Sequence, residues 1–221
     1  MVSFDDKDRY AISRQRMIDH HLLGRDIDDA RVLDAMGHVP REWFIPDQYA
    51  SNAYDDNPLP IGMGQTISQP YIVALMTQCL ELAGNEDVLE IGTGSGYQCA
   101  ILAALASNVY TIERFNELSE LAQAVLGKLD YTNIEFAVGD GSCGWPEEDR
   151  QFDRIIVTAA VPEIPDPLKN QLKEGGLIVA PVGETWTQEL IAAKKHKGQL
   201  VTKNICGCRF VKLIGRHGYS E

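Results

Sequence analysis

Hydrophobic and polar positions along this chain fall into blocks with different spacing. Residues 8–23 and 28–36 carry apolar positions at helical spacing, and acidic Asp28 and Asp29 stand where the second helix would begin. From 39 to 64 this period gives way to prolines and glycines among aromatic residues, which is typical of an ordered loop. A loop of this length inside a compact domain is usually functional, so we expect a role for it.

The middle of the chain predicts a sheet of parallel strands. After Pro70 the apolar positions follow the i, i+3, i+4, i+7 series of an amphipathic helix that closes at Gly84. Strands are then predicted at 87–91, 108–113, 134–138, 154–158 and 177–180, with helices at 97–106 and around a buried stripe of Leu118, Leu121, Ala122, Val125, Leu126 and Leu129. Near-continuous apolar strands that alternate with helices imply a parallel sheet covered on both faces. The sequence therefore predicts an α/β, doubly wound domain.

The last third of the chain has a different pattern. Short strand-like segments at 188–194, 200–206 and 208–214 are separated by Gly198 and Gly207, and short turns of this kind join antiparallel strands. We expect these segments to complete one edge of a mostly parallel sheet.

Charge narrows the classes of partner. The chain of 221 residues has 20 Lys and Arg against 32 Asp and Glu, a formal net charge of −12, so nucleic acid and anionic membranes are unfavourable partners. Residues 194–221 nevertheless carry seven Lys or Arg and one Glu, a net +6, against −18 for the rest of the chain. This basic segment is either a site for an anion or a solvated edge strand, and composition leaves both open.

Five cysteines and the N-terminus indicate the compartment. The count is odd, and residues 1–6 lack both the basic and the apolar region of a secretory signal, so we expect a reduced, cytoplasmic protein. One residue separates Cys206 from Cys208, less than the usual zinc spacing, so we interpret the pair as sharing one face of a strand and expect no metal site. The apolar runs 99–106 and 155–161 are too short to span a bilayer.

A glycine-rich loop follows the first predicted strand of the sheet and precedes a helix. Gly92, Gly94 and Gly96 allow positive φ and close backbone approach, as in nucleotide pockets at the carboxyl end of a strand. The dinucleotide fingerprint requires glycine at the position of Tyr97, which argues against an NAD-dependent oxidoreductase. Glu90 would repel a pyrophosphate and attract an ammonium group, which favours S-adenosylmethionine.

Two further acids stand at the ends of the next predicted strands. Glu113 lies 21 residues beyond Gly92, where an acid can accept hydrogen bonds from ribose hydroxyls. Asp140, which Gly141 follows, would reach the exocyclic amine of adenine. Either acid alone is better explained as a solvated strand end, but three strand-end acids beside a glycine loop favour a cofactor site.

Several longer stretches resemble one family, the protein-L-isoaspartate (D-aspartate) O-methyltransferases. They lie in order over nearly the whole chain, and Gln-Thr-Ile-Ser-Gln-Pro at 65–70 is far more specific than a glycine loop. The matching stretches are residues 39–42, 59–70, 88–97, 139–141, 157–160, 181–183 and 209–211. The resemblance implies a class I methyltransferase fold with additions at both ends. We interpret the chain as a single domain composed of N-terminal helices with an active-site loop (1–69), a cofactor-binding core (70–186) and C-terminal edge strands (187–221).

This resemblance also implies a reaction and its partners. The family uses S-adenosylmethionine to methylate the α-carboxylate of L-isoaspartyl residues in damaged proteins and peptides, which arise when Asn deamidates or Asp isomerises. The ester is a better leaving group than a carboxylate, so the backbone nitrogen closes a succinimide that hydrolyses partly back to aspartate. No nucleic acid, membrane or obligate protein partner is expected.

Site residues are carried over from the family by position, with Ser68 in the active-site position. The expected cofactor-binding residues are Gln65, Thr66, Ile67, Glu90, Gly92, Thr93, Gly94, Gly96, Glu113, Asp140 and Gly141, and the expected substrate-binding residues are Thr66, Ser68, Val211 and Lys212. The chain departs from the family pattern at Lys212, where proline is expected, and at Cys99, where alanine is common.

The residue types are consistent with this chemistry. A carboxylate is already deprotonated at neutral pH, so its methylation needs no general base, and the five histidines form no catalytic or metal-binding pattern. Ser68 is expected to donate a hydrogen bond that orients the carboxylate; alternatively, it only caps the helix that follows. Two other functions stay open: methylation of a different small molecule or side chain, and cofactor binding without catalysis.

Overall fold

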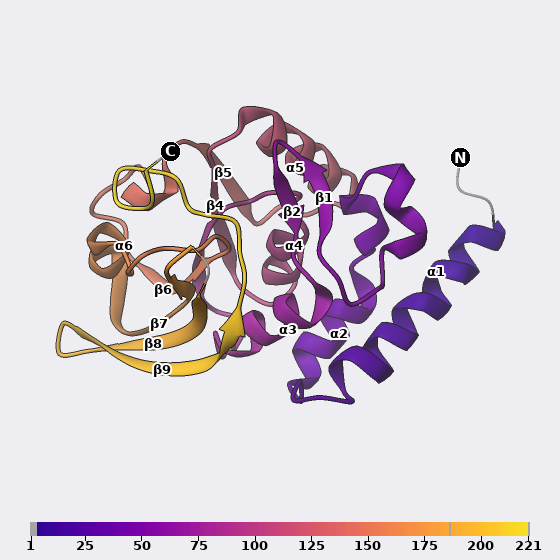
Figure 1. Cartoon of the computed structure of the whole chain (residues 1–221), viewed down its shortest axis with the longest axis horizontal. Helices are drawn as coiled ribbons and strands as arrows, with labels where there is room; N and C mark the ends of the chain where they lie inside the picture. The colour runs from indigo at the N-terminus through magenta and orange to yellow at the C-terminus, as the bar shows by residue number, and fades with distance from the viewer. Residues whose placement is uncertain (1–3, 186, 221) are drawn as a thin grey trace.

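A seven-stranded sheet forms the centre of the molecule, which a computed structural model describes for residues 4–185 and 187–220 (Figure 1). The strand order is β5-β4-β3-β6-β7-β8-β9, and the strands are β3 (Asp87–Ile91), β4 (Asn108–Glu113), β5 (Ile134–Val138), β6 (Phe152–Val157), β7 (Leu172–Gly183), β8 (Gln188–His196) and β9 (Gln199–Cys208). Neighbours from β5 to β7 are parallel, whereas β8 and β9 pair in antiparallel fashion. The predicted architecture is therefore confirmed.

The observed strands follow the predicted ones closely. β3, β4 and β5 coincide with the segments predicted from apolar runs, and β6 begins two residues before its prediction. β7 is much longer than predicted, because it extends back to Leu172, which pairs with Phe152 beyond a register shift. The apolar pattern misses this extension since charged residues and two glycines interrupt it.

Helices cover both faces of the sheet. The helices are α2 (Ala30–His38), α3 (Pro70–Gln78), α4 (Tyr97–Ala103) and α5 (Asn116–Lys128) on one face, and the short α6 (Asp166–Gln171) on the other. Successive residues of a strand point to opposite faces, so Val88 packs with the first group while Leu89 packs on the side of α6. The sequence pattern misses α6, because six residues show no helical period.

Two details of the predicted helices need correction. Leu121 of α5 was expected in the core but is 63% exposed, because the buried face of α5 follows Leu118, Ala122 and Leu126. The helix after Pro70 ends at Gln78 rather than running to Gly84.

The N-terminal segment adds helices and a small hairpin beside the sheet. Its elements are α1 (Phe4–Arg16), the π-helical η1 (Met17–Leu22), the 3-10 helices η2 (Arg41–Phe44) and η3 (Asp47–Asn52), and the antiparallel strands β1 (Leu59–Gly62) and β2 (Gln65–Ile67). The prediction of an ordered loop at 39–64 is right in that no α-helix forms there. The 3-10 helices and the hairpin were not predicted, because elements of three to six residues leave no period to detect.

The C-terminal edge is an antiparallel hairpin, as predicted. Cys206 and Cys208 lie two residues apart in β9, opposite Leu190 and Gln188 of β8, so they share one face, and both are free thiols. The predicted strand at 208–214 is wrong, because Lys212 makes only an isolated bridge to Ala160. Within the described ranges, no helix has the length and apolar character needed to cross a membrane.

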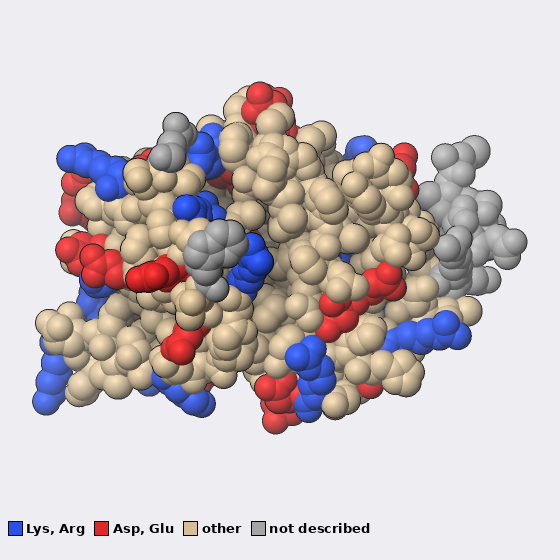
Figure 2. Space-filling view, in the orientation of Figure 1, with Lys and Arg blue, Asp and Glu red and all other residues tan. Residues whose placement is uncertain are grey.

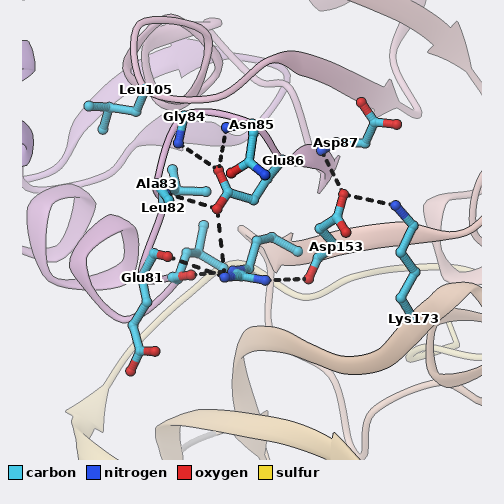
Figure 3. Close-up of polar contacts among 12 residues, drawn as sticks. Glu81, Leu82, Ala83, Gly84, Asn85, Glu86, Asp87, Leu105, Asp153 and Lys173 are labelled. Atoms are coloured by element: carbon cyan, nitrogen blue, oxygen red, sulfur yellow. Dashed lines mark hydrogen bonds and ion pairs between the residues drawn. The ribbon is translucent and has the colours of Figure 1, made fainter.

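A polar cluster fixes the connection between α3 and β3, at the opposite end of the strands from the glycine loop (Figure 3). The carboxylate of Glu86 accepts hydrogen bonds from the N–H groups of Ala83, Gly84 and Asn85 at 2.8, 2.8 and 3.1 Å. Arg154 of β6 lies 3.8 Å from this carboxylate and donates to the Leu80 and Glu81 carbonyls. The cluster ties the end of α3 to the sheet, and thereby also holds the helix that begins at the candidate site.

Candidate active site

A cleft opens where the parallel strands β3, β4 and β6 end. Most of the predicted site residues line it, namely Gln65, Thr66, Ile67, Ser68, Gly92, Thr93, Gly94, Glu113, Gly141, Val211 and Lys212. Figure 2 shows the molecule hollowed in the middle of this face, with Lys and Arg side chains on one rim. The cleft thus brings together residues from the long loop, the core and the C-terminal segment.

The glycine loop is held in a conformation that requires glycine. Gly92 has φ +99°, and a Cβ there would lie 2.4 Å from the Thr158 hydroxyl oxygen. That hydroxyl donates to the Ile91 and Gly92 carbonyl oxygens, at 3.0 and 2.7 Å. Gly94 has φ +54°. At these two positions the loop therefore presents bare backbone to the cleft.

Glu113 joins the end of β4 to this loop. Its Oε2 accepts a 2.8 Å hydrogen bond from the N–H of Gly94, and its Oε1 accepts one of 3.1 Å from Phe115. Although only 5% exposed, the residue lines the cleft. A carboxylate held in place by two amides, with its remaining lone pairs toward the cleft, is suited to accept hydrogen bonds from hydroxyl groups.

The opposite wall is the segment from Gln65 to Ser68, which rests on a buried arginine. The guanidinium of Arg41 donates from Nη2 to the Ser68 carbonyl at 2.7 Å and from Nε to the Ala53 carbonyl at 2.8 Å. It also lies over the ring of Tyr97, 4.8 Å from the centroid. Burial lowers the pKa of Arg41 to about 10, so the side chain stays charged at neutral pH.

Ser68 does not cap the helix that follows it. The N-cap of α3 is Gln69, and its side chain makes no capping bond. The N–H of Tyr71 instead binds the Asp56 carboxylate at 3.1 Å, which gives the helix start its side-chain acceptor. The alternative that Ser68 serves only as a cap is therefore wrong.

A second groove meets the main cleft at Ser68. It is lined by Pro58, Thr66, Ser68, Gln69 and Ile72 on one side and by Gly207, Cys208, Arg209, Phe210 and Val211 on the other, with Thr158 between them. The cleft and the groove share Thr66, Ser68, Thr158 and Val211. Two ligands, one in each space, would meet beside the Ser68 hydroxyl.

Glu90 does not face the cleft, which corrects the reason for predicting it. Its carboxyl is fully buried behind the glycine loop, and burial raises its pKa to about 8. The Thr111 hydroxyl donates to its Oε2 at 2.6 Å and lies 2.7 Å from the hydroxyl of Thr93, which lines the cleft. A mostly protonated group cannot attract an ammonium by charge, so any influence of Glu90 on the cofactor passes through Thr111 and Thr93.

Gly96 and Asp140 also lie outside the cleft lining. Gly96 begins α4 with φ +88°, and a Cβ there would lie 3.1 Å from Ala122 and Leu126 of α5, so this glycine serves helix packing. The Asp140 carboxylate accepts hydrogen bonds from Ser142 and from the N–H of Arg216 in the C-terminal segment. These two residues therefore stand next to cleft-lining residues without lining the cleft themselves.

Two basic residues of the C-terminal segment, Arg209 and Lys212, border different spaces. Lys212 lines the main cleft, and its Nζ lies 5.2 Å from the centroid of the Tyr219 ring. Arg209 lines the groove beside Ser68. Lys194 and Lys203 instead belong to strands β8 and β9 and line neither space. The basic segment therefore reaches the cleft and the groove only through residues 207–214.

Sequence reasoning missed several residues of the lining. Thr158 was noted only within a matching stretch, although its place at the end of β6, beside β3, was the available signal. Met76 belongs to the apolar series of the helix predicted after Pro70, and it also borders the cleft. Arg41 was noted only in a matching stretch, and its contact with Ser68 spans 27 residues of sequence. No local pattern reveals such a contact.

Comparison with known proteins agrees with this geometry. The family model described as protein-L-isoaspartate(D-aspartate) O-methyltransferase matches residues 12–218. A protein-L-isoaspartate O-methyltransferase of Desulfosudis oleivorans is 51% identical over 221 residues, covering 100% of both chains. A solved protein-L-isoaspartate O-methyltransferase superimposes with a TM-score of 0.84 at 30% identity, covering 93% of this chain and 67% of the other.

A second solved structure supports the fold alone. It is a candidate protein-L-isoaspartate O-methyltransferase from Plasmodium falciparum in complex with S-adenosyl-L-homocysteine, with a TM-score of 0.79, 24% identity and coverage of 93% of this chain and 98% of the other. The sheet order, the glycine loop after β3 and the acid ending β4 define a class I methyltransferase fold. Within that class, the chain belongs to the protein-L-isoaspartate (D-aspartate) O-methyltransferase family.

Proposed function

We propose that this chain transfers a methyl group from S-adenosylmethionine to the α-carboxylate of L-isoaspartyl residues in damaged proteins and peptides. The observation that carries the proposal is the meeting, at Ser68, of two separate spaces, the cleft and the groove. A small donor in the cleft and a polypeptide in the groove would then be in contact. Family membership supports the same reaction.

The residues of the cleft fit the cofactor. The bare backbone of Gly92 and Gly94 leaves room that side chains would fill, and Glu113 presents a fixed carboxylate to ribose hydroxyls. We infer that these residues, with the segment from Gln65 to Ile67, hold the cofactor. When bound, S-adenosylmethionine supplies an electrophilic methyl group on a positively charged sulfur.

Ser68 is proposed to orient the acceptor. Its hydroxyl can donate a hydrogen bond to the attacking carboxylate, and its backbone is fixed by Arg41 rather than by helix capping. Thr66 and Val211 are proposed to contact the isoaspartyl residue, since both line the cleft and the groove. Lys212 borders the cleft and Arg209 the groove, so both add positive charge where an anionic group would arrive.

Alignment and exclusion of water account for the catalysis that we propose. Holding two reactants in line contributes on the order of 7–11 kcal/mol to lowering a barrier. An anion and a cation neutralise each other during methyl transfer, so a site with little water favours the transition state over the separated charges. The carboxylate arrives deprotonated, and the reaction needs no general base.

Paired peptides test the proposal. The protein is incubated with methyl-labelled S-adenosylmethionine and two peptides that differ only in an L-isoaspartyl or L-aspartyl linkage. Base-labile label on the isoaspartyl peptide alone is expected. Equal labelling of both peptides, or none on either, would overturn the assignment. Calorimetric titration with S-adenosyl-L-homocysteine separately shows whether the cofactor binds, which distinguishes loss of substrate recognition from loss of cofactor binding.

A methyltransferase that acts on another small molecule or side chain is the second candidate. Hydroxyl and amine acceptors carry a proton at neutral pH and call for a general base. No histidine is among the described residues that line the cleft, and the Glu113 carboxylate is bound by two amides. These observations favour an acceptor that needs no base.

We also propose that the protein works in the cytoplasm on polypeptide substrates without an obligate partner. The odd number of cysteines and the net charge of −12 support a reduced compartment and disfavour nucleic acid and anionic membranes. Fractionation of cells and co-purification at low salt test this proposal. Stable recovery with nucleic acid or membranes would contradict it.

A further inference from the structure

The chain contains a single Asx–Gly dipeptide, Asp140–Gly141, at the edge of the cofactor cleft. Asp–Gly is prone to isomerisation because glycine has no side chain to hinder its backbone nitrogen. That nitrogen attacks the side-chain carboxyl carbon of the preceding aspartate. A protein proposed to act on isoaspartyl sites thus carries a sequence that can form one, and carries it at its own site.

The structure explains why neither residue is easily replaced. A Cβ at position 141 would lie 2.6 Å from Cγ2 of Ile91 and 3.2 Å from Cγ2 of Ile112, so the buried backbone there requires glycine. The Asp140 carboxylate in turn anchors the C-terminal segment, through a 2.7 Å hydrogen bond from the N–H of Arg216. The labile pair is therefore a consequence of the packing around the cleft.

The carboxylate of Asp140 is held by donors on both oxygens. Oδ1 accepts hydrogen bonds from the N–H and the hydroxyl of Ser142 at 2.9 and 2.6 Å. Oδ2 accepts the bond from Arg216, and the Cys143 thiol lies 3.6 Å from it. The Ser142 hydroxyl also accepts a 2.9 Å bond from the N–H of His217, so it links Asp140 to the C-terminal segment a second time.

These contacts oppose isomerisation in two ways. Partial burial alone would raise the pKa of Asp140, but the donors from Arg216 and Ser142 outweigh it and lower the pKa. Ring closure needs the neutral carboxyl, because its hydroxyl group can leave as water. A carboxylate would have to expel an oxide ion, which is a much poorer leaving group. The hydrogen bonds also fix both carboxylate oxygens, so the carboxyl group cannot rotate freely toward the nitrogen of Gly141.

We propose that Asp140–Gly141 is a latent succinimide site of this protein, and that Ser142 together with residues 212–219 keeps it unreacted.

In the reaction the Gly141 nitrogen forms a bond to Cγ of Asp140, and the carboxyl C–O bond breaks. The nitrogen's proton and the carboxyl hydroxyl leave together as water. Addition of water to either carbonyl of the ring then gives aspartate or isoaspartate. Isoaspartate adds one carbon to the backbone and would displace Gly141 from its contact with Ile91. This proposal does not depend on the methyltransferase activity.

The test measures isoaspartate at residue 140 during incubation of the full chain at pH 7.4 and 37 °C. Digestion with a protease that cleaves before aspartate but not isoaspartate, followed by mass spectrometry, gives the fraction of residue 140 that has become isoaspartate.

Two variants loosen the contacts that hold the Asp140 carboxylate. Ser142→Ala removes the hydroxyl, and Gly215→Ala places a Cβ 2.0 Å from Oδ1 of Asp140, which displaces the C-terminal segment. Ser119→Ala, which removes a buried hydroxyl from α5, is the matched control.

Conversion in the native chain is expected to be at least tenfold slower than in the same chain unfolded in denaturant. Ser142→Ala and Gly215→Ala should each raise the native rate several-fold, whereas Ser119→Ala should leave it unchanged. Thermal unfolding confirms that each variant is folded. If one of the two loosened variants does not fold, the other one is enough for the test. Equal rates in the native and unfolded chains, or loosened variants that match the control, would overturn the proposal. The absence of isoaspartate at residue 140 even in the unfolded chain would do the same.

Discussion

The guanidinium of Arg41 holds the backbone of Ser68 through a 2.7 Å hydrogen bond from Nη2 to the carbonyl oxygen. Arg41 is fully buried, and its Nη1 has no hydrogen-bond partner among the described residues. Burying a charged group with an unpaired donor costs stability, which indicates that Arg41 serves another task. We interpret that task as fixing the position of Ser68, since the second carbonyl it binds belongs to Ala53 in the same long loop.

Replacing Arg41 should therefore affect turnover more than cofactor binding. A hydrogen bond to a charged group contributes about 1.5–3 kcal/mol, so Arg41→Met is expected to lower kcat roughly tenfold to a hundredfold, and Arg41→Lys less. Initial rates on an isoaspartyl peptide measure this, beside the affinity for S-adenosyl-L-homocysteine. Arg31→Met is the control, because Arg31 also donates to two carbonyls, of Leu82 and Leu105, but away from the site. A similar loss of kcat in both variants would contradict the positioning role.

Ser68→Ala should separate catalysis from stability. Loss of the hydroxyl is expected to cut kcat about tenfold or more, by the same hydrogen-bond energy, while the melting temperature stays nearly unchanged. Asp56→Ala should do the opposite, because this carboxylate receives the N–H of Tyr71 at the start of α3. Thermal unfolding and peptide kinetics on both variants provide the comparison. A Ser68→Ala protein with full activity and a lower melting temperature would refute the proposed role.

The buried Glu90 predicts a pH dependence of stability. Its pKa is raised from about 4.3 in an unfolded chain to about 8 in the folded protein. The folded state thus binds a proton that the unfolded state releases, so stability falls as pH rises from about 4.3 toward 8 and then levels off. Glu90→Gln removes this dependence. Its melting temperature should exceed the wild-type value by a margin that grows between pH 5 and 8, and parallel curves would argue against a protonated Glu90.

Glu86 predicts the opposite pH dependence. Partial burial alone would raise its pKa, but the N–H groups of Ala83 and Gly84 and the charge of Arg154 lower it. Its stabilisation is therefore complete above the unfolded pKa of about 4.3 and is lost as pH falls through the folded value. Glu86→Gln should melt below wild type at pH 7, and the gap should close toward pH 3. A constant gap over this range would show that the carboxylate charge contributes nothing.

Arg209 and Lys212 should assist substrate capture. Arg209→Gln and Lys212→Gln are each expected to raise KM severalfold and to weaken its dependence on salt, because charge attraction is screened by ions. Lys203→Gln is the matched control, since Lys203 is exposed on β9 and lines neither the cleft nor the groove. Kinetics at two salt concentrations decide the matter. If all three variants behave alike, the basic segment is only a solvated edge.

Local patterns predicted the sheet because its central strands β3, β4 and β6 are largely buried and therefore apolar. The apolar runs of β3, β4 and β5 give the strand bounds directly, and the glycine loop could be placed because three glycines follow the first of these runs. The antiparallel edge was also predictable, since glycine separates its segments at Gly198.

The rest of the site depends on contacts that no local pattern contains. Glu90 was predicted to face the cofactor from its place before the glycines, but strand alternation turns its side chain into the core. Asp140 stands at a strand end as predicted, yet its partner is Arg216, 76 residues later in the chain. Arg41 likewise reaches Ser68 from a separate part of the long loop. Tertiary packing decides these side-chain directions, and spacing alone does not encode it.

Strand β9 lies at the end of the sheet, and this position gives its lysine, Lys203, a bearing on self-association. A terminal strand presents backbone hydrogen-bonding groups to any other strand that approaches, and charged side chains are a common barrier to such pairing. Val201 is 61% exposed on this strand, and Lys203 stands two residues further along. Lys203, which lines neither the cleft nor the groove, thus discourages self-association of a protein whose proposed work is to admit other polypeptide chains beside this edge.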